Sequence, residues 1–274
     1  MPPPTGCSYD NALVRIYDNR QTMGLAAAAD AAALIRKAVE EWGGARVMIA
    51  TGNSQLDVVD SLVKQPEVPW QATEIFHMDE YLGIPPDHPA SFRRWIRERV
   101  EEPLHGVRVN YIEGDAADPE AEIRRYTELL QSGPIDLAFV GFGENGHIAF
   151  NDPHVAAFED PSVMRRVTLD EACCRQQVGE GHFRALADVP TEALTVSCSC
   201  LLHARAWICC VPELRKAQAV SRALLGRISS ECPASAVRMH PNARVYLDPE
   251  SASVLLRQAG PLQTRQRSWV DSRS

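Results

Sequence analysis

The chain has 274 residues, of which 45 % are hydrophobic and 23 % charged, and its formal net charge is -8 at pH 7. This is the composition of an ordinary globular protein, so we expect one domain over 1–274 with its core at about 12–255 and a loose polar tail at 263–274. The acidic balance argues against a nucleic-acid-binding surface, because binding a phosphate backbone requires concentrated Lys and Arg.

Two further classes are disfavoured by the sequence. The N-terminal segment MPPPTGCSYDNA has neither a basic start nor an apolar run, and about 18 uncharged apolar residues never follow one another. We therefore expect neither secretion nor a membrane span. The eight cysteines lack paired C-x-x-C motifs and histidines at matched spacing. We expect reduced, mostly buried thiols in a cytoplasmic protein that needs no metal and no cofactor.

Strand patterns alternate with helical patterns along the chain. Short apolar runs predict strands at 12–17, 46–50, 74–78, 107–112, 135–140, 193–197, 206–211 and 243–247. Helices are predicted at 22–41, 55–64, 91–100, 119–131 and 213–225. The first ends at Gly43, and the last places Leu214, Ala217, Val220 and Leu224 on one face. This alternation predicts an α/β fold with a mostly parallel sheet covered by helices on both faces.

Ligands bind to such sheets beyond the carboxyl ends of the strands, and four polar segments follow predicted strands. The first is the turn Thr51-Gly52-Asn53-Ser54. Its glycine exposes backbone N–H groups, and its hydroxyls add donors at the start of a helix, which suits a phosphate. A plain helix cap by Ser54 or Asn53 is the alternative.

The second segment, HMDEYLG at 77–83, carries Asp79 and Glu80 at a strand end. Either carboxylate can take a proton from carbon if it lies in a partly dry cleft, and the alternative is a loop carboxylate that caps a turn. Another segment, PELRK at 212–216, places Lys216 at the start of a helix. Its ammonium can bind phosphate there, unless it is a solvated surface lysine.

The remaining segment is GFGENGHIAFNDP at 141–153, with three glycines within six residues. Glycines let the backbone approach a ligand closely, and Asn145, His147 and Asp152 can move and orient protons. The spacing does not fit a dinucleotide fingerprint, because no GxGxxG opens a helix after this strand, and it is not a Walker loop. A proton-transfer site is therefore indicated.

Taken together, the motifs resemble those of the glucosamine-6-phosphate deaminase family, over about 12–255. MDEY followed by HPASF, GHIAFN in its glycine-rich loop, and the strand-end lysine carry the resemblance. It implies a Rossmann-like α/β fold shared with the sister 6-phosphogluconolactonases, whose loops look more like DER and GEDGHTASL. By position, Asp79 matches the aspartate that moves a proton between C2 and C1, and His147 matches the histidine that assists ring opening. Thr51, Gly52, Ser54 and Lys216 match phosphate-binding positions, and Asn53 lies in the same turn.

The chain departs from the family pattern at three positions. Asn145 stands where many deaminases have an aspartate, and Asp152 where they have a glutamate. A neutral amide can still orient the imidazole but cannot stabilise imidazolium as a carboxylate does. Gln177 takes the position of a phosphate-binding arginine, and the helical spacing directs Arg175 elsewhere. His-Val-Ala at 154–156 replaces the serines of allosterically regulated members, so we expect no activation by an N-acetylated sugar phosphate.

The leading hypothesis is thus an enzyme that converts glucosamine 6-phosphate to fructose 6-phosphate and ammonia. An epimer such as galactosamine 6-phosphate is the closest alternative substrate, and isomerisation without deamination is another reaction of the same site. A lactone hydrolase of the sister family needs no carbon base, so the Asp79 loop counts against it. A non-catalytic sugar-phosphate sensor is suggested only by Asn145 and Gln177. The expected ligand is a small sugar phosphate, and the sequence leaves the oligomeric state open, including a homo-oligomer.

Overall fold

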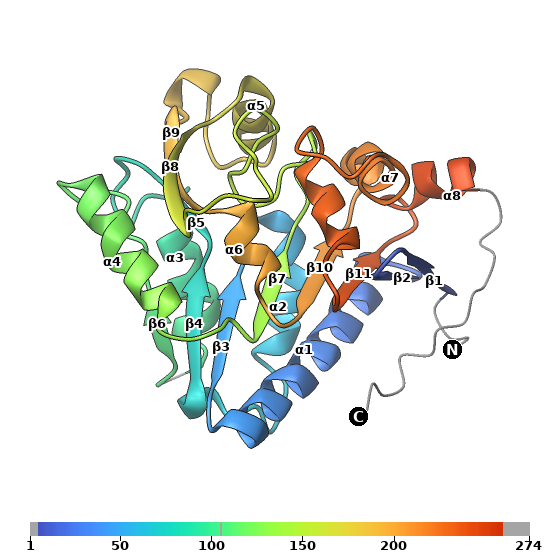
Figure 1. The fold of residues 1–274 in the computed structure, drawn as a ribbon, viewed down its shortest axis with the longest axis horizontal. Helices are drawn as coiled ribbons and strands as arrows, with labels where there is room; N and C mark the ends of the chain where they lie inside the picture. Colours follow the sequence, from blue (N-terminus) through green and yellow to red (C-terminus); the bar gives the residue numbers. More distant parts are fainter. Residues whose placement is uncertain (1–4, 105, 260–274) are drawn as a thin grey trace.

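An eight-stranded sheet forms the centre of the protein in the computed structural model, which describes residues 5–104 and 106–259 (Figure 1). The strand order is β1-β2-β11-β10-β7-β3-β4-β6, and only β1 and β2 pair antiparallel. The expected mostly parallel α/β sheet is therefore confirmed. Its strands are β1 (Thr5–Tyr9), β2 (Ala12–Ile16), β3 (Ala45–Ile49), β4 (Thr73–His77), β6 (Arg108–Asn110), β7 (Leu137–Val140), β10 (Trp207–Val211) and β11 (Ala243–Leu247). The predicted tail at 263–274 lies outside the described residues.

Helices pack on both faces of this sheet, as predicted. One apolar cluster joins the sheet to α1 (Arg20–Trp42), α2 (Leu56–Leu62) and α3 (Phe92–Ile96). The cluster on the other face joins it to α4 (Pro119–Gln131), α6 (Cys198–Leu202), α7 (Ala217–Leu225) and α8 (Ser253–Ala259). Because strand side chains alternate between faces, Ile208 of β10 joins the first cluster and Cys209 the second. Burial on both faces explains why the strands read as continuous apolar runs.

The first helix begins and ends where its sequence directs. Asn19 accepts a hydrogen bond from the backbone N–H of Thr22, and the Thr22 hydroxyl accepts one from the backbone N–H of Asn19, which completes a capping box. At the other end Gly43 adopts a left-handed conformation with φ 77°, so the predicted glycine stop is confirmed.

The predicted strand at 193–197 is the main correction to the fold. It forms β9 (Glu192–Val196), which lies in a second, antiparallel sheet between β5 (Asp79–Tyr81) and β8 (Met164–Thr168). The chain leaves the main sheet at Met78 and starts β5 at once, and an apolar run does not specify which sheet it joins. Figure 1 shows this small sheet and α5 (Glu171–Gly179) beyond the carboxyl ends of the main strands.

The small sheet has an apolar cluster of its own. Tyr81 lies at its centre, with ring centroids 5.1 Å from Phe92, 5.1 Å from Phe150 and 5.2 Å from Phe183. The small sheet, α5 and this cluster together are called the cap below.

The predicted helix at 213–225 is interrupted. Glu213 has a positive φ of 82°, and residues 214–216 form the 3₁₀ turn η5 (Leu214–Lys216) before α7 begins at Ala217. The tighter turn rotates Leu214 out of phase with the helix, so Leu214 is 62 % exposed and its expected place on the buried face is wrong.

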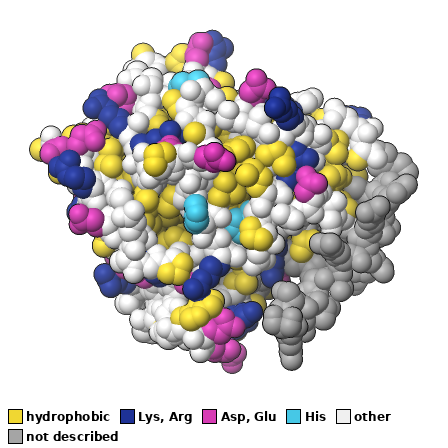
Figure 2. All heavy atoms as spheres, viewed as in Figure 1, with side chains coloured by type: hydrophobic (Ala, Val, Ile, Leu, Met, Phe, Trp, Pro, Cys, Tyr) yellow, Lys and Arg dark blue, Asp and Glu magenta, His cyan; other side chains and the backbone are white. Residues whose placement is uncertain are grey.

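The surface and the thiols agree with the composition. Over the described ranges 5–104 and 106–259, none of the helices has both the length and the apolar character needed to cross a bilayer. Basic and acidic side chains are interspersed around the rim of the face shown in Figure 2. All eight cysteines are free and six are buried, so the expectation of mostly buried thiols is confirmed.

Candidate active site

A single pocket brings together the four polar segments that the sequence singles out. It lies beyond the carboxyl ends of β3, β4, β7 and β10, where ligands bind in open α/β sheets. Residues of α5 and the segment after it close one side. The lining consists of Ala50, Thr51, Gly52, Asn53, Ser54, Met78, Asp79, Phe92, Gly141, Phe142, Gly143, His147, Ala149, Phe150, Gln176, Gln177, Glu180, His182 and Lys216.

The turn after β3 does not serve as a plain helix cap. Gly52 has φ 101° and precedes the 3₁₀ turn η1 (Asn53–Gln55), and neither η1 nor α2 has a side-chain cap. Asn53 instead donates from Nδ2 to the backbone oxygen of Glu180 at 3.3 Å. The capping alternative is thus wrong, and the turn faces the pocket with its backbone and polar side chains.

The carboxylates after β4 have different environments. Glu80 is fully buried, and its oxygens accept hydrogen bonds from the Ser91 hydroxyl at 2.7 Å and from the backbone N–H groups of Tyr81, Phe92 and Arg93. These bonds hold Glu80 in a structural role at the start of α3. Asp79 lines the pocket instead.

Asp79 has the properties of a strong base. Its side chain is 6 % exposed, and burial followed by the negative charge of Glu80 raises its pKa well above the ordinary aspartate value. A raised pKa means that the carboxylate, once ionised, is a stronger base than an ordinary aspartate. Asp79 is therefore the one of the two carboxylates that can act on a molecule in the pocket.

His147 forms a pair with Asp152. Its Nδ1 lies 3.1 Å from Oδ1 of Asp152, and both side chains are almost entirely buried. Burial raises the pKa of Asp152, but the hydrogen bond and charge of His147 and the hydrogen bond from Asn145 outweigh it, so the pKa is lowered. The carboxylate therefore stays ionised beside the imidazole, and Nε2 is the ring nitrogen left for a ligand.

Asn145 does not contact the imidazole, contrary to the expectation that its amide orients the ring. Its Nδ2 donates to Oδ1 of Asp152 and to Oδ2 of Asp170, both at 2.9 Å, and its Oδ1 accepts from the backbone N–H of His147. The turn through Gly146, with φ 91°, directs the amide toward the two carboxylates. Asn145 thus positions Asp152, which in turn contacts the ring.

Gly143 is required by the close approach of the ring. A β-carbon at this position would lie 2.3–2.4 Å from Cε1, Nδ1 and Nε2 of His147, closer than atoms can pack. The glycine-rich motif after β7 therefore makes room for the imidazole as well as for a ligand.

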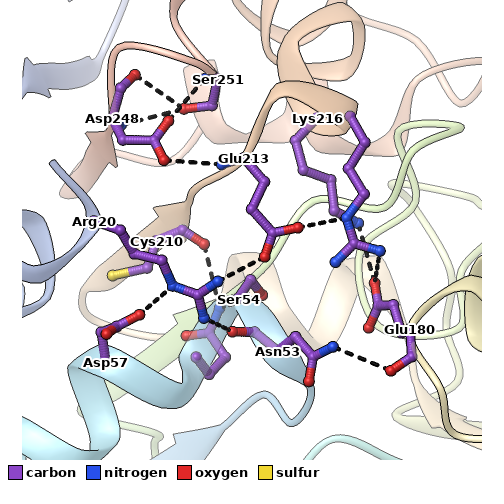
Figure 3. Close-up of polar contacts among 12 residues, drawn as sticks. Arg20, Asn53, Ser54, Asp57, Glu180, Cys210, Glu213, Lys216, Asp248 and Ser251 are labelled. Atoms are coloured by element: carbon purple, nitrogen blue, oxygen red, sulfur yellow. Dashed lines mark hydrogen bonds and ion pairs between the residues drawn. The ribbon is translucent and has the colours of Figure 1, made fainter.

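Lys216 is buried rather than solvated, so the surface-lysine alternative is wrong. Its side chain is 3 % exposed and its Nζ lies 3.6 Å from Oε1 of Glu180, as Figure 3 shows. Burial lowers the pKa of Lys216, and the charge of Glu180 opposes that shift. Nη1 of Arg215 lies 3.2 Å from the same carboxylate oxygen.

Apart from Gln177, the residues of α5 and of the segment after it that line the pocket were not identified from the sequence motifs. Gln177 accepts a hydrogen bond from the Tyr81 hydroxyl at 2.7 Å and lines the pocket, whereas Arg175 pairs with Glu171 in solvent, as helical spacing predicts. Glu180 and His182 also line the pocket. Their only signal in the sequence was the pair of glycines on either side of Glu180.

Two groups of side chains in the described ranges are close enough to hold a cation: His147 with Asp152 and Cys173, and Asp152 with His154 and Asp170. Asp152 is common to both and already accepts hydrogen bonds from Asn145 and from the backbone N–H of Asp170. Burial raises the pKa of Cys173 well above the ordinary thiol value, which disfavours the thiolate that binds metals. Metal independence remains a prediction.

Known proteins resemble this chain over most of its length. A glucosamine-6-phosphate deaminase of Exiguobacterium sibiricum is 32 % identical over 213 residues, which are 77 % of this chain and 82 % of that protein. The structure of a monomeric glucosamine-6-phosphate deaminase matches with a TM-score of 0.81 and 29 % identity, over 88 % of this chain and 99 % of that one. A putative 6-phosphogluconolactonase of Neisseria gonorrhoeae shares the fold, with a TM-score of 0.69 and 17 % identity over 86 % of this chain and 98 % of that one.

The family model described as glucosamine-6-phosphate isomerases/6-phosphogluconolactonase matches residues 18–246. This range contains every residue that lines the pocket and reaches every strand of the main sheet except β1 and β2. The chain therefore belongs to the glucosamine-6-phosphate isomerase/6-phosphogluconolactonase family.

Proposed function

We propose that the chain is a glucosamine-6-phosphate deaminase, which opens the sugar ring, isomerises the aldose to a ketose phosphate and releases ammonia. One observation carries the proposal: a buried carboxylate with a raised pKa, an imidazole–carboxylate pair and a buried lysine all line one pocket. The deaminases among its relatives support the same reaction.

In the proposed mechanism, the turn at Thr51 to Ser54 and Lys216 bind the phosphate, which fixes one end of the sugar. His147 then takes the proton from the C1 hydroxyl and passes a proton to the ring oxygen, and the ring opens. Asp152 holds the imidazole in position for this transfer.

Asp79 acts in the next step. It takes the proton from C2 and returns it to C1. The carbonyl oxygen gains a proton and the amino group loses one, so that C1 becomes an alcohol and an imine is left at C2. Water adds to this imine and ammonia leaves, which gives the ketone. Every proton removed from carbon is returned to carbon, and one water is consumed for each ammonia released.

A lactone hydrolase is the main alternative, since the family includes 6-phosphogluconolactonases. Hydrolysis of a lactone requires attack by water and no base for a C–H bond. The placement of Asp79, and not the hydrogen-bonded Glu80, in the pocket favours the deaminase. Incubation with each sugar separately distinguishes glucosamine 6-phosphate from galactosamine 6-phosphate as the substrate.

The test is to incubate the protein separately with glucosamine 6-phosphate, galactosamine 6-phosphate and 6-phosphogluconolactone. We expect equal amounts of ammonia and ketose phosphate from an amino sugar, and no acid from the lactone above the uncatalysed rate. Ketose without ammonia identifies a plain isomerase, acid from the lactone alone identifies the hydrolase, and binding without any product identifies a sensor.

The proposed setting is the cytoplasm. Eight free thiols, two of them in the adjacent pair Cys209 and Cys210, fit a reducing compartment. A homo-oligomer is compatible with this function but is not required by it, because each chain supplies all of the pocket residues named here.

A further inference from the structure

The carboxylate of Glu180 lies among the groups that are proposed to bind the phosphate. Its Oε1 is 3.6 Å from Nζ of Lys216 and 3.2 Å from Nη1 of Arg215, and it accepts a hydrogen bond from Nε2 of Gln176 at 2.8 Å. The side chain is only 7 % exposed. Glu180 therefore holds the position of an anion inside the pocket.

The same carboxylate also approaches the turn after β3. A β-carbon on Gly52 would lie 3.8 Å from Oε2 of Glu180, and Nδ2 of Asn53 donates to the backbone oxygen of Glu180. Figure 3 shows Asn53, Glu180 and Lys216 converging from three separate segments. A phosphate bound to both Lys216 and this turn would be repelled by a negative carboxylate that lies close to both.

The chain around Glu180 has room to move. Gly179 ends α5, Gly181 has φ 83°, and a β-carbon at either position would meet no atom within 4 Å. The space beside these two glycines is therefore open, and glycine adopts many conformations at little cost. Glu180 thus lies between two glycines at the end of α5, where a change of backbone conformation costs least.

We propose that Glu180 occupies the phosphate subsite as an internal anion in the ligand-free protein, and that a phosphorylated ligand binds by displacing it. The proposal rests on the phosphate subsite of the proposed function and adds a residue that sets its affinity. Because the ligand must compete with a tethered carboxylate, its apparent affinity is lower than the subsite itself allows.

The experiment measures the binding of inorganic phosphate by calorimetry, which requires no sugar and no turnover. We expect Glu180→Gln to bind phosphate about tenfold more tightly than the parent, since the competing charge is removed while the shape is kept. Glu144→Gln is the matched control, because Glu144 contacts the same Arg215 at 3.6 Å but does not line the pocket. The control should bind phosphate as the parent does.

Lys216→Ala separates this proposal from the proposed function. If it leaves phosphate binding unchanged, or if none of the proteins binds phosphate, the subsite itself is misplaced. If it weakens binding but Glu180→Gln binds no more tightly than the parent, the subsite stands and the role of Glu180 is overturned.

A second measurement does not depend on any variant. A crystal structure of the parent protein soaked in phosphate should show the anion at Lys216 and the carboxylate of Glu180 turned away from it. Phosphate bound at Lys216 with Glu180 still in contact with that lysine overturns the displacement.

Discussion

Nδ1 of His147 lies 3.1 Å from Oδ1 of Asp152, while the amide of Asn145 contacts the carboxylate and not the ring. The residue two places before the histidine therefore acts on the imidazole through Asp152. Asn145 holds Asp152 by a hydrogen bond, and Asp152 lies next to the imidazole. Asn145 therefore has a positioning role that can be tested.

Asn145→Ala should lower turnover by about tenfold and leave phosphate binding unchanged. It removes hydrogen bonds to the buried carboxylate of Asp152 and the partly buried one of Asp170, and one acceptor for a backbone N–H. We therefore also expect a loss of roughly 2–3 kcal/mol in the free energy of unfolding. Turnover, phosphate calorimetry and urea unfolding measure the three effects. Weaker phosphate binding at unchanged turnover would instead place Asn145 among the residues that bind the phosphate.

Asp79→Asn should reduce isomerisation by about a hundredfold to ten-thousandfold, because the proton acceptor is lost without a change of shape. Binding of phosphate should be almost unaffected, since Asp79 is proposed to act on C1 and C2 of the sugar and not on the phosphate. Steady-state rates and calorimetry on the same preparation test both statements. A variant that keeps more than a third of the parent's turnover removes Asp79 from the mechanism.

Gly143→Ala should abolish most of the activity while the protein stays folded. The new methyl group would overlap the imidazole of His147, which must rotate away from Asp152. Gly6→Ala in β1 is the matched control, because its methyl group would meet atoms only at an ordinary contact distance of 3.7 Å, and Gly6 does not line the pocket. Rates and circular dichroism of both variants are compared, and equal activity in the two would show that the ring position does not matter.

Glu180 should contribute to stability in a pH-dependent way. Burial raises its pKa, but the hydrogen bond from His182 and the charges of Lys216 and Arg215 outweigh this and hold the pKa at about 2, below the ordinary 4.5. A carboxyl with a lowered pKa stabilises the folded state above its unfolded pKa, and that stabilisation is lost as the pH falls toward the folded value.

Relative to Glu180→Gln, the parent should therefore be more stable by roughly 3 kcal/mol at neutral pH. The difference should shrink between pH 4.5 and about 2. Urea unfolding of both proteins at a series of pH values measures it. A difference that stays constant across this range would mean that the charge of Glu180 is not what stabilises the fold.

Activity should survive exhaustive chelation, because side chains alone can carry out the proposed proton transfers. The measurement is turnover after chelator treatment, with the metal content determined in parallel. A chelated protein that is inactive and regains activity with zinc or magnesium contradicts the proposed mechanism and directs attention to the group of His147, Asp152 and Cys173.

The main sheet could be predicted from the sequence because strands buried on both faces read as apolar runs between helical patterns. The cap could not. β5 is three residues long and polar, and β8 carries two arginines, so neither has the pattern of a buried strand. Leu214 was misplaced because the left-handed conformation of Glu213 cannot be read from a helical pattern.

The site could be predicted as far as it depends on strand ends. Asp79, His147 and Lys216 follow strands that share one edge of the sheet, and they therefore meet. Glu180 and the partners of Asn145 depend instead on how α5 packs over the pocket and on the path of one turn. These are tertiary relationships that no local spacing encodes.

The separate aromatic cluster around Tyr81 allows the cap to open independently of the main sheet. A region with its own apolar cluster can open as a cooperative unit while the rest of the molecule stays folded. The amides of β8 and β9 should then exchange with deuterium sooner than those of β3, β7 and β10. Asp79, Gln176 and Gln177 would thus belong to a part of the pocket wall that opens sooner than the strand ends of the main sheet.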